Sequence, residues 1–459
     1  DLPICAKVIV LQPLNYTQKG ALFMNSLQQK SLNFNKKLFC DFNGGNLSSD
    51  SGLLLVRSFM ENLEVRSIFE ALFNDSVRRT HEISSVIEQL IYQNIAGYHN
   101  DDAADDLRYD HVFTSILDKE ALASQPTISR VMNTFKKQDL EKFNYVLEYL
   151  YKSTNPVKGK ENIILDLDST NVETYGNQEL SEYIYHYAKN GYHPLVVYDG
   201  LTKDLMKFEL RKGSIYTSTG VKEFLDPVIR SLKKTYPKAT ILVRGDSGFA
   251  IPDLYDLCNE HDIKYIIKLK ANASLHNLAS FNMDLFIESY KTDYSEYHAS
   301  FDEFLYQAKS WPEERRVVYK IERDALQLDP RTTFIVTNLE LGAMDIYSVY
   351  NHRGNMENFI KETKLDFGME TLSHSTFAAN QAKAMILAIA YNIINAMKRI
   401  ALPDKHKSNR MMTIRSTLIK VAGRFISHSN KFIFKLSSSF PYKKLFMQVL
   451  TRINQFSLS

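Results

Sequence analysis

The sequence predicts an α/β protein in which a mixed β-sheet is covered by helices, and three observations lead to this prediction. Between residues 156 and 271, short apolar runs typical of buried strands alternate with stretches of helical periodicity. The preceding region, residues 40–155, shows helical periodicity alone. With 459 residues, of which 44% are hydrophobic and 24% charged, the chain has enough apolar material for two or three domains with sizeable cores.

Charge is unevenly distributed along the chain. The formal net charge is only +3, but residues 401–459 contain eleven Lys or Arg and a single acid, Asp404, so that this region carries +10. A basic region attached to a near-neutral body indicates a polyanionic partner such as a nucleic acid. A solvated basic helix without a partner is the alternative.

The cysteine content and the hydropathy argue against two classes of protein. Cys5, Cys40 and Cys258 are odd in number and far apart, which argues against a disulfide-stapled domain or a zinc site and predicts buried thiols in a reducing cytosol. No apolar run approaches 18 residues, so we expect no membrane span and a cytoplasmic location.

Residues 1–39 are predicted to be an N-terminal tail. They begin without a Met, and residues 1–23 contain only a short apolar run with no cleavage-site pattern, so we expect the native start at Met24 rather than a signal peptide. Residues 40–155 are predicted to form a small all-helical, DNA-binding domain, because their apolar residues recur at helical spacing.

One helix of this region has a polar face suited to reading DNA. Ser124 is a predicted N-cap, and apolar residues line one side of the helix that follows it. Thr127, Arg130 and Asn133 line another side, as in a DNA-reading helix. An ordinary amphipathic helix is the alternative.

Residues 156–271 are predicted to hold the sheet, in the order β-β-β-α-β-α-β. The expected elements are a strand at 161–170, two strands within 192–213, a helix at 221–236, a strand at 239–246, a helix at 252–261 and a strand at 264–270. Asp168 in the first strand and Asp246 at the end of the fourth can then meet at one edge of the sheet. A carboxylate in such an apolar run is costly to bury unless a cation compensates it.

The remaining chain is predicted to interrupt and then complete this sheet domain. Residues 272–340 alternate apolar and polar positions and are expected to form a β-rich insertion. The core resumes over 341–400 with a helix at Tyr350–Lys364 and a long apolar helix at Ala378–Ile400. Residues 401–459 are expected to form a basic, helical C-terminal region.

The segment Tyr350–Lys364 aligns four polar side chains on one stripe of the predicted helix. At about 100° per residue, Arg353, Glu357 and Lys364 all fall within about 60° of Tyr350. Surface charge pairs are the alternative for any two of these residues. An acid flanked by a guanidinium, an ammonium and a phenol, all of which can bind phosphate, is what a metal-dependent nucleic-acid enzyme needs.

Three carboxylates are therefore predicted to form a metal site. Asp168, Asp246 and Glu357 have the oxygen ligands that Mg²⁺ or Mn²⁺ prefers, and together they can hold two ions. Two such ions, about 3.5–4 Å apart, clamp the attacking and leaving oxygens of an in-line phosphoryl displacement. Arg353 and Lys364 are then expected to hold the phosphodiester, and Tyr350 to hydrogen-bond it.

Several motifs resemble one known family. DLDST at Asp166–Thr170, RGDSGF at Arg244–Phe249 and Y-x2-R-x3-E-x6-K at Tyr350–Lys364 resemble the DDE-type bacterial insertion-sequence transposases, and the last motif resembles the signature of their YREK branch. NGGNLSSDSGLLL, GYHNDDAADDLRYD and LASQPTISR are similar to motifs of one bacterial subgroup. The resemblance covers roughly residues 40–400.

This resemblance implies an RNase H-like catalytic core, formed by 156–271 and 341–400, and cut-and-paste DNA transposition. It makes Asp168, Asp246 and Glu357 the metal-binding triad. Asp166 is the less fitting candidate, because the family's acid directly precedes the small hydroxyl pair that follows Asp168 here. Met356, next to Glu357, departs from the more polar or small residue expected at that position.

The resemblance also implies partners. These are double-stranded DNA, both the terminal inverted repeats of a transposon and its target, and a second copy of the chain, because two DNA ends must be paired. The expected location is the bacterial cytoplasm, in association with the nucleoid. If the donor ends pass through a hairpin, a base-flipping aromatic is needed. The only Trp, Trp311, is a candidate, and a core Trp is the alternative.

Two other functions remain open. A restriction-type nuclease would use Glu362 and Lys364 as an E-x-K element, although such nucleases carry this element on a strand and Glu362 lies about 140° from Glu357 on the predicted helix. The second is a non-catalytic DNA-binding descendant of a transposase, against which the three intact acids argue.

Overall fold

The computed structural model describes residues 30–289, 295–428 and 431–458. The expected start at Met24 lies outside these ranges. The chain divides into two compact units, residues 1–46 and 47–459. In the first unit, β1 (Lys30–Leu32) and β2 (Asn35–Cys40) form an antiparallel hairpin. All other elements named below belong to the second unit.

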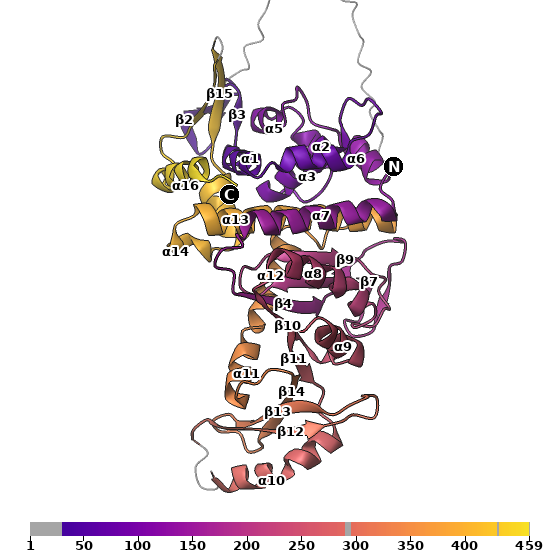
Figure 1. Cartoon of the computed structure of the whole chain (residues 1–459). Helices are drawn as coiled ribbons and strands as arrows, with labels where there is room; N and C mark the ends of the chain where they lie inside the picture. The colour runs from indigo at the N-terminus through magenta and orange to yellow at the C-terminus, as the bar shows by residue number, and fades with distance from the viewer. Residues whose placement is uncertain (1–29, 290–294, 429–430, 459) are drawn as a thin grey trace, which may run out of the picture. The chain divides into compact units, whose positions relative to one another are not determined.

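The second unit contains an eight-stranded mixed sheet, which extends from the middle of the view to its lower part in Figure 1. Its strands are β4 (Asn162–Ser169), β8 (Leu195–Asp199), β9 (Leu205–Glu209), β10 (Thr240–Gly245), β11 (Lys264–Leu269), β12 (His298–Tyr306), β13 (Arg315–Arg323) and β14 (Arg331–Thr337). The spatial order is β12-β13-β14-β11-β10-β4-β8-β9. Strands β4, β10 and β11 are parallel, whereas β8 and β9 add as an antiparallel pair. The five strands from β9 to β11 thus have the RNase H-like order 3-2-1-4-5, which confirms the predicted core.

The two faces of β4 are chemically different, and this difference positions the acids. Ile163, Leu165 and Leu167 pack into the core beneath α8 (Val221–Thr235) and α9 (Pro252–Glu260). Because side chains alternate along a strand, Asp166 and Asp168 point to the opposite face.

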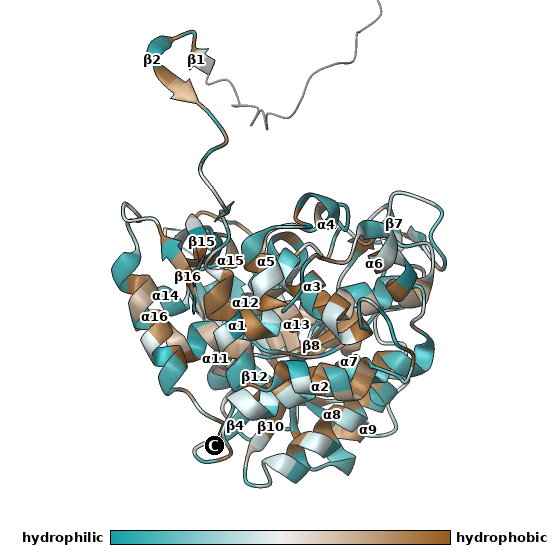
Figure 2. Ribbon diagram, turned by 90° about the horizontal axis from the view of Figure 1, so that it is seen from above, coloured by the Kyte–Doolittle hydropathy of each residue, from teal (hydrophilic) through white to brown (hydrophobic). Residues whose placement is uncertain are grey.

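Helices from both halves of the sequence cover the other face of the sheet. Those before the sheet are α1 (Leu53–Asn62), α2 (Val65–Phe73), α3 (Ile83–Ala96), α4 (Ala103–Asp106), α5 (His111–Ile116), α6 (Gln125–Met132) and α7 (Lys137–Thr154). Of these, α1, α3, α6 and α7 contact α13 (Phe377–Ala401), which lies among α1, α3 and α7 in Figure 2. The predicted helical region 40–155 therefore shares one hydrophobic core with α13 and with the C-terminal region.

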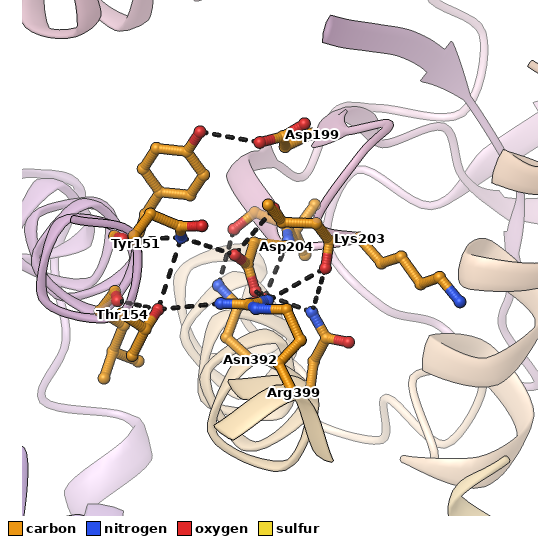
Figure 3. Close-up of polar contacts among 12 residues, drawn as sticks. Tyr151, Thr154, Asp199, Lys203, Asp204, Asn392 and Arg399 are labelled. Carbon is orange, nitrogen blue, oxygen red and sulfur yellow. Dashed lines mark hydrogen bonds and ion pairs between the residues drawn. The ribbon is translucent and has the colours of Figure 1, made fainter. Parts of the chain in front are cut away.

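Helix α13 is long and apolar enough, by length and composition, to cross a membrane. However, 89% of its most apolar 18-residue window is buried inside the protein, as expected for a core helix. A buried polar network ties this helix to the sheet and to α7 (Figure 3). Arg399 donates to Asp204 (2.8 Å) and to Thr154 (3.1 Å), while Tyr151 donates to Asp199 (2.8 Å).

The C-terminal region differs from the predicted basic helical tail. It contains α14 (Asp404–Lys407), α15 (Met411–Ile414), a π-helical turn (Arg415–Ile419), the hairpin of β15 (Gly423–His428) and β16 (Lys431–Leu436), and α16 (Lys443–Gln455). Strand β15 also pairs with β3 (Leu47–Ser48), so the region expected to be all-helical contains a short strand. The short β-branched and aromatic runs of the hairpin, Phe425-Ile426 and Phe432-Ile433-Phe434, are the strand signal that the charge count obscured.

The insertion is β-rich as predicted, but it also contains a helix, α10 (Ala273–Ser289). This helix was missed because apolar residues occupy both its buried and its exposed sides, so that its amphipathic contrast is weak. The antiparallel strands β12–β14 extend the central sheet through pairing of β14 with β11. Trp311 is buried against the rings of Tyr255 and Tyr306, so it is a core residue of this region.

Candidate active site

Asp168 and Asp246 emerge at the same edge of the sheet. Strands β4 and β10 are parallel neighbours in which Asp166 pairs with Arg244, so Asp168 and Asp246 each follow two residues later. Asp246 ends its strand by capping a short 3-10 turn, where its carboxylate accepts the Gly248 N–H at 2.8 Å. The parallel register of two buried strands is therefore what brings these two acids together.

Glu357 comes to the same place from a broken helix. The predicted helix Tyr350–Lys364 is three segments: the end of α11 (Ala343–Asn351), then α12 (Gly354–Lys361), then a π-helical turn (Glu362–Asp366). The break arises because α11 packs on the insertion strands, whereas α12 packs on the core around α13. Glu357 lies in the first turn of α12.

All three acids line one cleft of about 780 Å³. Other polar groups on its walls include Ser169, Thr170, Thr217, Ser247, Lys361 and Lys364. The cleft is also lined by Tyr185, His186, Tyr187 and Tyr216. Sequence reasoning missed these aromatic residues, and the run YIYHY at 183–187 is the signal that was available.

The electrostatic environment of Asp168 favours a cation. Burial is the main cause that raises the pKa of Asp168 to about 6; the Arg353 guanidinium opposes this effect, and Asp246 and Glu357 add to it. Arg353 Nη2 lies 3.4 Å from Asp168 Oδ2 and donates to the Leu167 carbonyl at 3.0 Å. The positive charge of Arg353 thus offsets only part of the effect by which burial disfavours the ionised form of Asp168.

The donor set fits a hard divalent cation. Carboxylate oxygens are the ligands of Mg²⁺, which typically takes one or two protein carboxylates and completes its shell with water and substrate phosphate. Within the described ranges, no three Asp, Glu, His or Cys side chains lie close enough together to form a closed metal cluster. Mg²⁺ needs fewer protein ligands than such a cluster provides, and the three acids that line the cleft are enough to supply them.

Lys364 and Tyr350, which also belong to the predicted polar stripe, differ in their position relative to the cleft. Lys364 lines the cleft and forms an ion pair with Glu370 (3.0 Å). Tyr350 does not line the cleft, although the charges of Arg353, Asp246 and Asp168 influence its phenol. Burial raises the pKa of Tyr350 to about 12, so the phenol remains a hydrogen-bond donor at neutral pH.

Comparison with known proteins identifies the family. The family model for the transposase DDE domain, group 1, matches residues 30–458. The chain belongs to this family of DDE-domain transposases. The resemblance inferred from the sequence is thereby confirmed at family level, while the bacterial insertion-sequence origin and the YREK branch stay predictions.

Two further comparisons concern individual proteins. No curated protein matches the transposase. Among solved structures, it is similar to the piggyBac transposase in its cryo-EM synaptic complex with hairpin DNA, with 13% sequence identity and a TM-score of 0.44. The match covers 81% of this chain and 79% of that chain.

Two acids near the triad are engaged elsewhere in the transposase. Asp166 is buried in an ion pair with Arg244. Glu362 is buried, accepts the Met411 N–H at 2.7 Å and lies 3.3 Å from Lys398 Nζ. Neither acid lines the cleft that contains Asp168, Asp246 and Glu357.

The predicted DNA-reading residues lie on α6 or directly after it, away from the residues that line the cleft. Arg130 is exposed and donates to the Pro126 carbonyl of its own helix (3.0 Å). Asn133 is exposed at the C-cap and accepts from Thr376 at 3.4 Å. Thr127 is half-buried beside Ser124.

Proposed function

We propose that this transposase cuts the ends of a DNA element and joins them to a target by cut-and-paste transposition. Asp168, Asp246 and Glu357 would hold two Mg²⁺ or Mn²⁺ ions. The observation that supports this proposal is that acids from a strand, a strand end and a helix line a single cleft. Asp168 adds to this support, because its partly buried carboxylate faces the cleft with Arg353, at 3.4 Å, beside it.

When bound, such ions stabilise the charge on the attacking and leaving oxygens of phosphoryl transfer. The protein's own residues then bind and orient the DNA. The Leu167 carbonyl and Asp168 keep Arg353 beside the acids, where its planar guanidinium can contact a phosphodiester bidentately. Lys364, at the cleft wall, supplies a second positive charge. The neutral phenol of Tyr350 would donate a hydrogen bond to phosphate.

The proposed partners follow from this chemistry. Double-stranded DNA would bind as the element's terminal inverted repeats and as target, and two copies of the chain would pair two ends in the active complex. The polar side of α6 would read the ends. The proposed location is the bacterial cytoplasm, in association with the nucleoid.

The test is a cleavage and strand-transfer assay with DNA from both ends of the element and Mg²⁺. Asp168→Asn, Asp246→Asn and Glu357→Gln should each lower cleavage by roughly 10³-fold or more, because each removes a proposed metal ligand. The matched control is Asp345→Asn, which removes one exposed carboxylate on α11 that does not line the cleft. It should cleave as wild type does.

Three outcomes would contradict the proposal. Full activity in a triad variant removes that residue from the site. Specific end binding without cleavage or joining by the wild type indicates a non-catalytic descendant. Cleavage without joining, dependent on Glu362 rather than Glu357, indicates a restriction-type nuclease.

A further inference from the structure

Most of the basic residues in 401–459 are already bound within the protein. Of the eleven Lys and Arg residues, three form ion pairs: Lys407 with Asp404 (2.9 Å), Arg410 with Asp366 (3.0 Å) and Lys420 with Asp50 (2.6 Å). Three others donate to backbone carbonyls: Arg415 to Ile95, Arg452 to Leu402 and Lys443 to Ser438. The positive charge that is free to meet a partner is therefore concentrated in a few places.

The β15–β16 ribbon carries most of this free charge. Arg424, Lys431 and Lys435 are exposed, and in the described part of the chain they make no ion pair or side-chain hydrogen bond. The strand register places Arg424 directly opposite Lys435, and His428 directly opposite Lys431. Arg424 and Lys435 are like charges at directly opposed positions, which destabilises an antiparallel pair. A polyanion on this surface would relieve that repulsion.

The four basic side chains share one face of the ribbon. Alternate residues of a strand point to opposite sides, so Phe425, Phe434 and Leu436 form the other face. Phe425 stacks on His111 of α5, with ring centroids 5.1 Å apart, and Phe434 and Leu436 pack against the main core. The apolar face thus anchors the ribbon, and the basic face is turned away from the core.

We propose that the basic face of the β15–β16 ribbon binds the phosphate backbone of double-stranded DNA. The cross-strand pairs Arg424–Lys435 and His428–Lys431 are four residues apart, or about 13 Å along a strand. This matches the roughly 12 Å width of the major groove, which admits a two-stranded ribbon. Each pair then faces one of the two backbones that border the groove, with Ile426 and Ile433 between them. The choice of DNA as the polyanion rests on the proposed function.

Binding of the full-length protein to random-sequence duplex DNA, measured by anisotropy over a series of salt concentrations in EDTA, tests this proposal without any cleavage. Arg424→Gln/Lys435→Gln should reduce the slope of log Kd against log salt by about 2 and weaken binding at least tenfold at low salt. The matched control is Lys405→Gln/Lys444→Gln, which removes the same charge from exposed lysines of the C-terminal region outside the ribbon. It should keep nearly the wild-type slope.

A second variant separates binding from folding. Arg424→Glu places a carboxylate opposite Lys435, so the ribbon gains an opposite-charge pair. Its Tm should equal or exceed that of the wild type, while its DNA affinity falls. Wild-type affinity and slope in both ribbon variants would overturn the proposal.

The chemical nature of the partner is tested with polyglutamate, a polyanion without a groove. If the ribbon variants lose as much affinity for polyglutamate as for DNA, the ribbon is a general acidic-protein surface and the assignment to DNA is wrong. Failure of the proposed function is seen separately. In that case the wild type binds DNA through the ribbon but does not cleave element ends with Mg²⁺.

Discussion

Arg244 and Asp166 form a buried, bidentate ion pair across the two strands that carry the candidate acids. Arg244 Nε lies 2.6 Å from Asp166 Oδ1 and Nη2 lies 2.7 Å from Oδ2, and the side chains are only 2% and 1% exposed. A Cβ on Gly200 would stand 2.5 Å from Asp166 Oδ2, so no larger residue fits beside the pair. The pair fixes the register from which Asp168 and Asp246 project.

Asp166→Ala should therefore destabilise the fold rather than remove a metal ligand. Leaving Arg244 buried and unpaired is expected to lower the free energy of unfolding by about 3–5 kcal/mol. Asp166→Leu/Arg244→Leu, which removes both charges, should recover much of this loss. Urea unfolding measures both effects. Wild-type stability of Asp166→Ala together with lost Mn²⁺ binding would make Asp166 a ligand instead.

The raised pKa of Asp168 predicts a specific dependence of stability on pH. Between the pKa of an ordinary Asp, about 3.8, and about 6, the folded protein binds a proton at Asp168 that the unfolded chain does not. This contribution to stability, at most about 3 kcal/mol, is complete below pH 4 and is lost as the pH rises through 6. Asp168→Asn should thus gain stability relative to the wild type between pH 4 and 7 in EDTA.

Divalent cations should reverse this trend, because they bind the ionised carboxylate. Mn²⁺ should raise the Tm of the wild type more at pH 7 than at pH 5, and should not raise that of Asp168→Asn. Thermal unfolding at the two pH values provides the measurement. An equal Mn²⁺ effect in both proteins would place the metal elsewhere.

Glu362→Gln should affect stability and leave the metal site intact. Burial lowers the pKa of Lys398, and the carboxylate of Glu362 counteracts this. Removing the acid leaves a buried ammonium without its partner, at an expected cost of about 3 kcal/mol. The Mn²⁺-induced rise in Tm should persist in this variant. Its disappearance, with unchanged stability in EDTA, would support the E-x-K alternative.

Replacing Thr127, Arg130 and Asn133 together with Ala should lower the preference for element ends. Their exposed or half-buried positions at α6 mean that little packing is lost, and each lost base contact costs about 1–3 kcal/mol of discrimination. Competition between end DNA and scrambled DNA measures the preference. Because the β15–β16 ribbon is intact, binding to scrambled DNA should change little. If the preference for element ends over scrambled DNA is unchanged, a surface other than that of α6 reads the DNA sequence.

The sequence was most informative where short apolar runs contain an acid. Short apolar runs predicted all five strands of the RNase H-like core, and Asp168 and Asp246 were singled out because acids are costly in buried strands. The turn at Asp199–Gly200 was likewise predicted, between β8 and β9. These features depend on local pattern, which one sequence contains.

Features that depend on distant partners were not predictable. Residue type and strand position alone do not distinguish Asp166 from Asp168, and the ion pair that occupies Asp166 involves Arg244, which is remote in sequence. The break before α12 arises because successive turns pack on different cores, a fact that periodicity does not contain. Short strands such as β15 are ambiguous because a window of six residues fits both helical and strand periods.

The burial of α13 has a consequence for biosynthesis. Its apolar surface is covered partly by residues near Leu53–Leu150, which leave the ribosome before the helix, and partly by Met411–Ile453, which leave it after the helix. The core around α13 cannot close until residues up to Ile453 have been synthesised, so this long apolar helix is still partly uncovered after its own synthesis is complete. We expect chains that end before Lys443 to be retained by chaperones or to aggregate, even though every residue of the candidate active site has been synthesised.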